Sequence, residues 1–254
     1  MRLPQAGPMR AALLFGGGIG AGLLISFIAL LLLFNLPYGR QPPVSATCME
    51  NPAESVIMLP EPSHAGMPLE EAIRERRSMR VFSNESLSLG ELSQLLWAAQ
   101  GITDERLGFR AAPSAGATYP LHVYVVPNRV EGTGCGIYLY DPFEHGLFLV
   151  REGEFSEEVS AAAFNQPHVR DSAAVFVIAS EPSRTFERYG NDTERFVHIE
   201  AGHVAQNILL EATSLGLAAS PIGSIYQDKM DSALGINGTG TNSVYVVIAG
   251  KKPD

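Results

Sequence analysis

Apolar residues form two kinds of pattern along this chain: one unbroken run near the N-terminus and shorter periodic runs from residue 68 onward. From Ala11 to Phe34 the chain reads AALLFGGGIGAGLLISFIALLLLF, 24 residues without a charged side chain. A helix of this length, at about 1.5 Å per residue, can cross a hydrocarbon core of about 30 Å. A cleaved signal peptide has a shorter apolar region of about 7–15 residues. We therefore expect a retained transmembrane helix at 11–34, preceded by an N-terminal flank at 1–10.

The periodic runs predict several helices. One begins near Pro68, where apolar positions follow at helical spacing. A second begins with a capping box at Ser88-Leu89-Gly90-Glu91 and ends at Gly101. The longest runs from about Glu194 to Leu215 and carries apolar residues on more than one side, which is typical of a helix buried in a core or an interface. Further helices are predicted at 156–165 and 227–234.

Short apolar or alternating runs predict strands at 122–126, 136–141, 146–152, 172–181 and 243–250. The run at 172–181 is almost continuously apolar, which is typical of a strand covered on both faces. Strands mixed with helices, without a βαβαβ run, favour an α+β domain, here residues 68–254.

Residues 35–67 lie between the apolar run and this domain, and they are rich in proline (Pro37, Pro42, Pro43, Pro52, Pro60 and Pro62). Proline fixes φ and removes a hydrogen-bond donor, so we expect an extended, semi-rigid linker rather than a packed element. Arg2 and Arg10 precede the predicted membrane helix and Arg40 follows it. The positive-inside rule then favours a single-pass protein with a cytoplasmic N-terminus and an extracytoplasmic domain.

Charge and cysteine content exclude some classes of function. The net charge is −9, and residues 41–254 hold 15 Lys and Arg against 27 Asp and Glu, which disfavours nucleic acid as a partner. Cys48 and Cys135 belong to no zinc motif, and we expect two unpaired thiols, with a disulfide between them as the alternative outside the cytoplasm. His198 and His203 are five residues apart and form no HExxH motif, so no metal site is predicted.

Four short segments could carry chemistry. Arg76, Arg77, Ser78 and Arg80 place forked donors and a hydroxyl together, which suits a phosphate, although a solvated helix end is the alternative. The small residues of 112–120 would let the backbone approach a flat ligand, or would simply form a turn. Residues 220–224 follow the long helix, and their exposed backbone amides could donate to an acceptor on a ligand. The GKK sequence at 250–252 offers two ammonium groups to an anion, or is a basic tail.

Taken together, these segments resemble the nitroreductase superfamily, and most of all its SagB/ThcOx-type dehydrogenases. The matching motifs cover nearly all of residues 67–253. They are RRSxRxF at 76–82, LLWAxQGI at 95–102, R-xx-PSAG-xx-YPL at 110–121 and EAGHxxQN at 200–207. The resemblance implies a mixed sheet flanked by helices and an intertwined homodimer that binds FMN between its subunits.

The resemblance also implies roles for individual residues. The segment Arg76, Arg77, Ser78 and Arg80 would hold the phosphate and ribityl chain together with Lys251 and Lys252. Pro113 and Ser114 would reach the flavin from the other subunit. In the turn formed by Pro221, Ile222 and Gly223, the Gly223 N–H would meet flavin N5. Apart from the resemblance, Asn207 on the long helix is interpreted as a buried hydrogen-bonding residue near the flavin rather than a catalyst, and Tyr119 is a candidate proton donor. Many relatives have an aromatic residue where this chain has Ile225.

The function expected from this resemblance is an FMN-dependent two-electron oxidoreductase that passes hydride through flavin N5. NADH or NADPH is a candidate electron donor, and the substrate is a small molecule or a peptide. Two alternatives are a non-catalytic flavin-binding membrane module and an azoline-oxidising component of a peptide-modifying complex.

Overall fold

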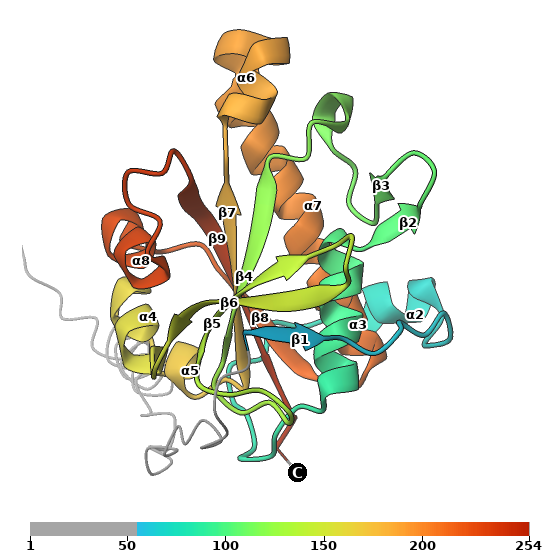
Figure 1. Cartoon of the computed structure of the whole chain (residues 1–254). Coiled ribbons are helices and arrows are strands. Elements are labelled where there is room, and N and C mark those ends of the chain that lie inside the picture. Colours follow the sequence, from blue (N-terminus) through green and yellow to red (C-terminus); the bar gives the residue numbers. More distant parts are fainter. Residues whose placement is uncertain (1–54, 254) are drawn as a thin grey trace, which may run out of the picture. The chain divides into compact units, whose positions relative to one another are not determined.

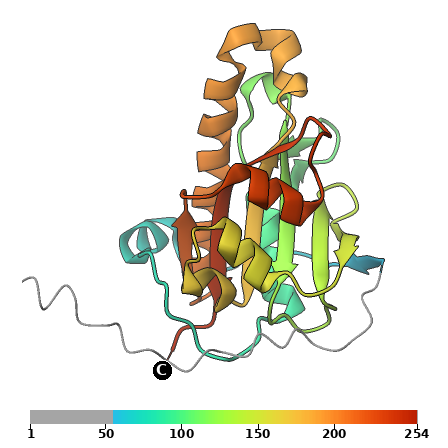
Figure 2. The same ribbon diagram turned by 90° about the vertical axis from the view of Figure 1, so that its left-hand side faces the viewer.

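The computed structural model describes residues 55–253, which contain a seven-stranded sheet in the order β1-β6-β5-β4-β7-β9-β8, with helices on both faces (Figures 1 and 2). The strands are β1 (Val56–Met58), β4 (Leu121–Pro127), β5 (Gly136–Asp141), β6 (Gly146–Glu152), β7 (Ala174–Ser180), β8 (Ala218–Ile222) and β9 (Asn242–Gly250). All pairings between neighbours in this sheet are antiparallel. The domain is α+β as predicted, but the expected mixed sheet is wrong, because parallel pairing occurs only at two isolated bridges in the described residues.

The central strand β7 separates two hydrophobic cores, and all of its residues are buried. One core lies between the sheet and the helices α3 (Leu89–Gln100) and α7 (Thr193–Ser214), with α2 (Leu69–Glu75) beside α7. The other lies under α4 (Ser156–Ala162), α5 (Pro167–Arg170) and α8 (Gln227–Leu234). Burial of β7 on both faces explains why its sequence is apolar without alternation.

Local patterns located most elements closely. The bounds of β5, β6 and α8 match the predicted ranges, and the capping box of α3 is formed: the Ser88 hydroxyl accepts from the Glu91 N–H at 3.2 Å. The Glu91 carboxylate in turn accepts from the Ser88 N–H at 2.9 Å. Helix α4 ends before the predicted residue 165, because Phe164 and Asn165 adopt left-handed φ values of 59° and 54°.

The long helix α7 is buried on one side rather than on several. Val197, Val204 and Ile208 pack in the core, whereas Ile199 is 45% exposed. Helix α6 (Ser183–Tyr189), which the sequence did not predict, precedes α7 and lies beyond the ends of the strands (Figures 1 and 2). The sequence also missed the small hairpin of β2 (Ile102–Asp104) and β3 (Phe109–Arg110) and the short 3-10 helices η1 (Ala115–Ala117) and η2 (Gly190–Asp192).

The expected extent of the linker needs correction. Residues 56–58 were expected to lie in a linker without packed elements, but they form β1 and pair with β6 in the register Ile57↔Leu147. Ile57 and Leu59 are buried in the core, so the packed domain begins before Pro68.

The expectation of two unpaired thiols is also wrong, because Cys135 is disulfide-bonded. Cys48 lies outside the described residues.

The predicted flank at 1–10, the predicted membrane helix at 11–34 and the first part of the predicted linker also lie outside the described residues. Among residues 55–253, no helix is both long enough and apolar enough to cross a membrane.

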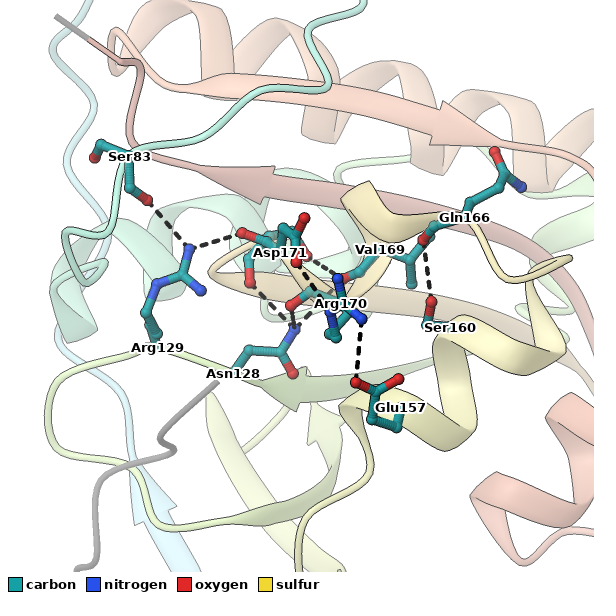
Figure 3. Close-up of polar contacts among 10 residues, drawn as sticks. Ser83, Asn128, Arg129, Glu157, Ser160, Gln166, Val169, Arg170 and Asp171 are labelled. Atoms are coloured by element: carbon teal, nitrogen blue, oxygen red, sulfur yellow. Dashed lines mark hydrogen bonds and ion pairs between the residues drawn. The ribbon is translucent and has the colours of Figure 1, made fainter. Parts of the chain in front are cut away.

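A buried polar network fixes the corner that follows β4 (Figure 3). The Asn128 side chain donates to the carbonyls of Arg170 and Ser172, both at 3.1 Å. The Arg129 guanidinium donates to the carbonyl of Asp171 at 2.8 Å and to that of Ser83 at 3.2 Å (Figure 3). Because Ser83 follows the arginine-rich segment, this network anchors that segment to the body of the domain.

Candidate functional site

The arginine-rich segment lies along the free edge of β8. Ser78 forms an isolated bridge with Ala219, and the Met79 N–H donates to the Ala219 carbonyl at 2.9 Å. Farther along, the Ser83 N–H donates to the Lys251 carbonyl at 3.0 Å. The structure therefore brings the segment from Arg76 to Arg80 next to the C-terminal end of β9, as the predicted anion site requires.

The side chains of this segment are not used equally. The Arg77 guanidinium donates to the carbonyls of Arg74 and Arg76, at 2.8 Å and 2.7 Å, and so caps the end of α2. Arg76 and Arg80 form no side-chain hydrogen bond or ion pair within residues 55–253, and Ser78 and Arg80 are exposed. Two guanidiniums and a hydroxyl are thus available to an anion, and their forked donors suit phosphate oxygens.

The two lysines of the predicted anion site differ. The Lys251 ammonium pairs with the Glu91 carboxylate at 2.6 Å, whereas Lys252 is exposed. Burial alone would raise the pKa of Glu91, but its bonds to Lys251 and Ser88 outweigh burial and lower the pKa. Lys251 therefore joins β9 to the N-terminus of α3, a contact that the sequence analysis missed because the two residues are far apart in the chain.

The segment 220–224 is largely strand, whereas the resemblance implied a turn at Pro221, Ile222 and Gly223. Ser220, Pro221 and Ile222 belong to β8 and pair with Ile248, Val247 and Val246. A proline is tolerated there because β8 is an edge strand. Gly223 and Ser224 follow the strand and are exposed. Gly223 lies four residues beyond Ala219, a distance of about 13 Å at about 3.3 Å per residue, so the arginine-rich segment and Gly223 lie at opposite ends of the same edge.

A second polar cluster lies where β4 begins, around the 113–119 loop. Pro113 is exposed, and the Ser114 hydroxyl accepts from the Tyr119 N–H at 2.9 Å. Gly116, Ala117 and Tyr119 have φ values of 60°, 54° and 44°, so this loop holds strained backbone. The Tyr119 hydroxyl accepts from the Arg110 N–H at 3.3 Å, and the Arg110 guanidinium lies 4.6 Å from the centre of the Tyr119 ring.

Glu200 of α7 contacts this loop through hydrogen bonds with Ser114 and Ala115, and it is only 2% exposed. Burial raises the pKa of Glu200 to about 7, although hydrogen bonds from Ser114 and Ala115 and the charge of Arg110 act in the opposite direction. Glu200 Oε1, Arg110 Nε and Gln100 Nε2 are buried without a hydrogen-bond partner in the structure. The motifs R-xx-PSAG and EAGHxxQN contain Arg110 and Glu200, but only the fold places these residues together.

Asn207 has a structural role in this chain. Its side-chain amide donates to the carbonyls of Ala98 and Ala111, at 3.0 Å and 3.3 Å, and so joins α7 to the end of α3 and to the start of the 113–119 loop. No hydrogen bond or ion pair among residues 55–253 connects this loop to the arginine-rich segment, which lies near the opposite end of β9. The described residues also contain no cluster of metal-ligating side chains.

Comparisons with known proteins agree with this architecture. The model of the nitroreductase family matches residues 73–251, more than half of the chain. A protein of Methanocaldococcus jannaschii assigned to the nitroreductases is 43% identical over 168 residues, covering 66% of this chain and 84% of that protein. The trifolitoxin operon protein TfxC of Rhizobium leguminosarum bv. trifolii is 23% identical over 189 residues, covering 68% of this chain and 53% of its own length.

Solved structures extend the comparison. A nitroreductase-like protein of Ralstonia eutropha JMP134 has a TM-score of 0.68 and 28% identity, covering 81% of this chain and 95% of that chain. The microcin synthetase McbBCD complex of Escherichia coli, with truncated pro-MccB17 bound, has a TM-score of 0.61 and 19% identity. The match covers 78% of this chain and 79% of that chain. The NADPH:FMN oxidoreductase of Vibrio harveyi, complexed with NAD+, has a TM-score of 0.54 and 19% identity. The match covers 73% of this chain and 69% of that chain. The last two show likeness of fold alone. On the extent of the family match and the identity to the M. jannaschii protein, this chain belongs to the nitroreductase family.

Proposed function

We propose that this chain is an FMN-dependent two-electron oxidoreductase of the SagB type. The observation that carries the proposal is the edge of β8. At one end lie Arg76 and Arg80, whose side chains have no ion pair or hydrogen bond among residues 55–253, and at the other lies the exposed backbone of Gly223. A cofactor with a phosphate at one end and a flat ring at the other fits this arrangement. Similarity to the nitroreductase family supports the choice of a flavin.

In this proposal the chain binds and orients the cofactor. Arg76, Ser78 and Arg80 bind the phosphate, and the Gly223 N–H donates a hydrogen bond toward the ring. FMN, when bound, supplies hydride transfer at N5. A fixed backbone donor near N5 favours charge that develops there, without the cost of reorienting solvent. NADH or NADPH is the proposed electron donor.

The proposed protein is a homodimer. Among residues 55–253, no hydrogen bond or ion pair joins the loop of Pro113 and Ser114 to the arginine-rich segment, which supports an approach of these two residues to the flavin of a second copy. Exposed apolar residues beyond the strand ends, Phe186 at 58% and Ile199 at 45%, support an interface on α6 and α7. In the proposed arrangement, each subunit completes the flavin site of the other.

We further propose that residues 11–34 anchor the protein in a membrane with the domain outside the cytoplasm. The disulfide at Cys135 supports this orientation, because disulfides persist in oxidising compartments. A second candidate function is oxidation of azoline rings in a peptide-modifying complex. It is favoured by similarity to the trifolitoxin operon protein TfxC and by likeness of fold to the microcin synthetase complex. The third candidate function is a flavin-binding module that does not turn over substrate.

The central test is the visible spectrum of the full chain extracted in detergent. We expect a yellow protein with about one FMN per subunit, bleached by NADH or NADPH and reoxidised afterwards. A folded but colourless protein that cannot be reconstituted with FMN would contradict the proposal. A yellow protein that neither NADH nor NADPH bleaches, and that oxidises no substrate, would favour the non-catalytic flavin-binding module. Formation of an azole ring on a peptide would favour the second candidate function.

A further inference from the structure

A pocket of about 510 Å³ opens between the start of α7, helix α6 and the beginning of β9. Its apolar wall includes Phe186, Val197 and Val244, and its polar wall includes Glu194, Asn242 and Ser243. The volume lies in the range of small-molecule sites, about 300–1,000 Å³. This pocket is separate from the polar clusters around Arg76 and Glu200.

The pocket is continuous with the end of β8 along two segments. Ile225 and Gln227, which follow Gly223 closely in the chain, line it directly. On β9, Val244 lines the pocket, and the next residue, Tyr245, lies 3.8 Å from the position that a Cβ at Gly223 would occupy. The pocket is therefore lined by segments that flank Gly223 in the chain and in the sheet, and Gly223 is where the proposed function places the reactive part of the flavin.

The lining chemistry indicates which molecules fit. The titratable groups that line the pocket are the carboxylate of Glu194 and the imidazole of His198, and no lysine or arginine lines it. Glu194 lies in the first turn of α7, where the helix dipole stabilises an anion. The side chains of Asn191, Asn242 and Gln227 carry amides that can both donate to and accept from a peptide group. Ser243 is 4% exposed, and its buried hydroxyl has no hydrogen-bond partner in the structure.

We propose that this pocket is the substrate pocket and that it selects neutral or cationic amide-bearing molecules, such as a peptide segment with an apolar side chain, over anionic ones. This inference rests on the proposed function, because it takes Gly223 as the marker of the redox centre. The apolar wall accepts the side chain, the amides pair with peptide groups, and Glu194 repels carboxylates and attracts an amine.

The test uses three matched probes on the full chain in detergent, with binding measured by ligand-observed NMR. Phenylalaninamide is cationic, N-acetylphenylalaninamide is neutral, and N-acetylphenylalanine is anionic. We expect the cationic probe to bind most tightly and the anionic probe to bind most weakly. Glu194→Gln should weaken the cationic probe about five-fold, the size expected for one partly exposed ion pair, and leave the neutral probe nearly unchanged. Glu187→Gln, on α6 but outside the pocket, is the matched control.

The visible spectrum of the same samples separates the two proposals. A shift of the flavin bands on binding of the neutral probe is expected, because the probe would lie beside the ring. Equal affinity for the anionic probe, or equal effects of Glu194→Gln and Glu187→Gln, would overturn the selectivity. Absence of binding by all three probes would overturn the pocket assignment and would fit a pocket filled by a second copy. A colourless protein that still discriminates among the probes would refute the flavin function and not the binding site.

Discussion

Glu200 is a buried carboxyl whose protonation should couple pH to folding. Its pKa is raised to about 7 in the folded protein, whereas an unfolded glutamate titrates near 4.3. Between these values the folded chain binds more protons than the unfolded chain, so the free energy of unfolding falls as pH rises. The stabilisation from Glu200 is complete below about pH 4.3 and is lost once pH exceeds about 7. Its size is at most about 4 kcal/mol, from a pKa difference of about 2.7 at about 1.4 kcal/mol for each pKa unit.

We therefore expect Glu200→Gln to flatten the dependence of the melting temperature on pH between about 5 and 7.5. Thermal unfolding followed by circular dichroism across this range measures the effect. Glu211→Gln, on the same helix, serves as a control for a less buried carboxyl whose pKa is also raised, by burial. An unchanged pH slope in the Glu200→Gln protein would show that this carboxyl stays ionised in the fold.

The arginines beside β8 give a second prediction at this scale. Arg76→Ala and Arg80→Ala should each weaken FMN binding by about 1.5–3 kcal/mol, the range for hydrogen bonds to charged groups. Riboflavin, which lacks the phosphate, should lose much less affinity in the same variants. Fluorescence titration of apoprotein with the two flavins measures both values. Arg74→Ala removes an exposed arginine paired with Glu71 and Glu75 and should leave both affinities unchanged. Equal losses for FMN and riboflavin would instead assign Arg76 and Arg80 to a solvated helix end.

Single residues also show how far the sequence could predict the site. The arginine-rich segment and Gly223 were predicted because the family motifs are contiguous in the sequence. The pairs Lys251–Glu91 and Arg110–Glu200 were not predicted, because each joins residues from distant parts of the chain. Contacts of this kind depend on packing of the whole sheet, which no local pattern encodes.

Among the elements, prediction succeeded where periodicity and end signals agreed. Helix α3 had both an apolar stripe and a capping box, and its bounds were correct. Strand β8 was not predicted, and its Pro221 is accepted because β8 is an edge strand. Strand β1 was missed because prolines surround it. The end of α4 depends on left-handed residues that are not glycines, Phe164 and Asn165, and such positions have no clear signature in a single sequence.

The capping box of α3 can be tested directly. Ser88→Ala removes the acceptor of the Glu91 N–H and should lower the free energy of unfolding by about 1 kcal/mol. Ser88→Thr should retain most of the stability, because threonine also caps helices well. Urea unfolding of the three proteins provides the comparison. Equal stability of the alanine variant would mean that the Glu91–Lys251 pair alone fixes this end of the helix.

For the whole molecule, the proposed dimer makes a prediction about the anchor. A fragment of residues 41–254 should remain dimeric and yellow without detergent, because the proposed interface uses α6 and α7 rather than the segment at 11–34. Obligate interfaces of this kind bury about 2,000 Å² or more. Size-exclusion chromatography with light scattering gives the mass, and the flavin spectrum gives occupancy. A flavin-free monomer would show that the N-terminal segment holds the dimer together, and it would remove Ser114 from the proposed flavin site.

Strand β1 determines where such a fragment can begin. Val56, Ile57 and Met58 cover the hydrogen-bonding edge of β6, which would otherwise present unpaired amides and carbonyls to solvent. A fragment that starts at Pro68, where the helical periodicity begins, would expose this edge and leave Leu147 without its covering neighbour. Exposed edges of this kind recruit strands from other molecules and promote aggregation. Strand β1 thus protects the domain against self-association.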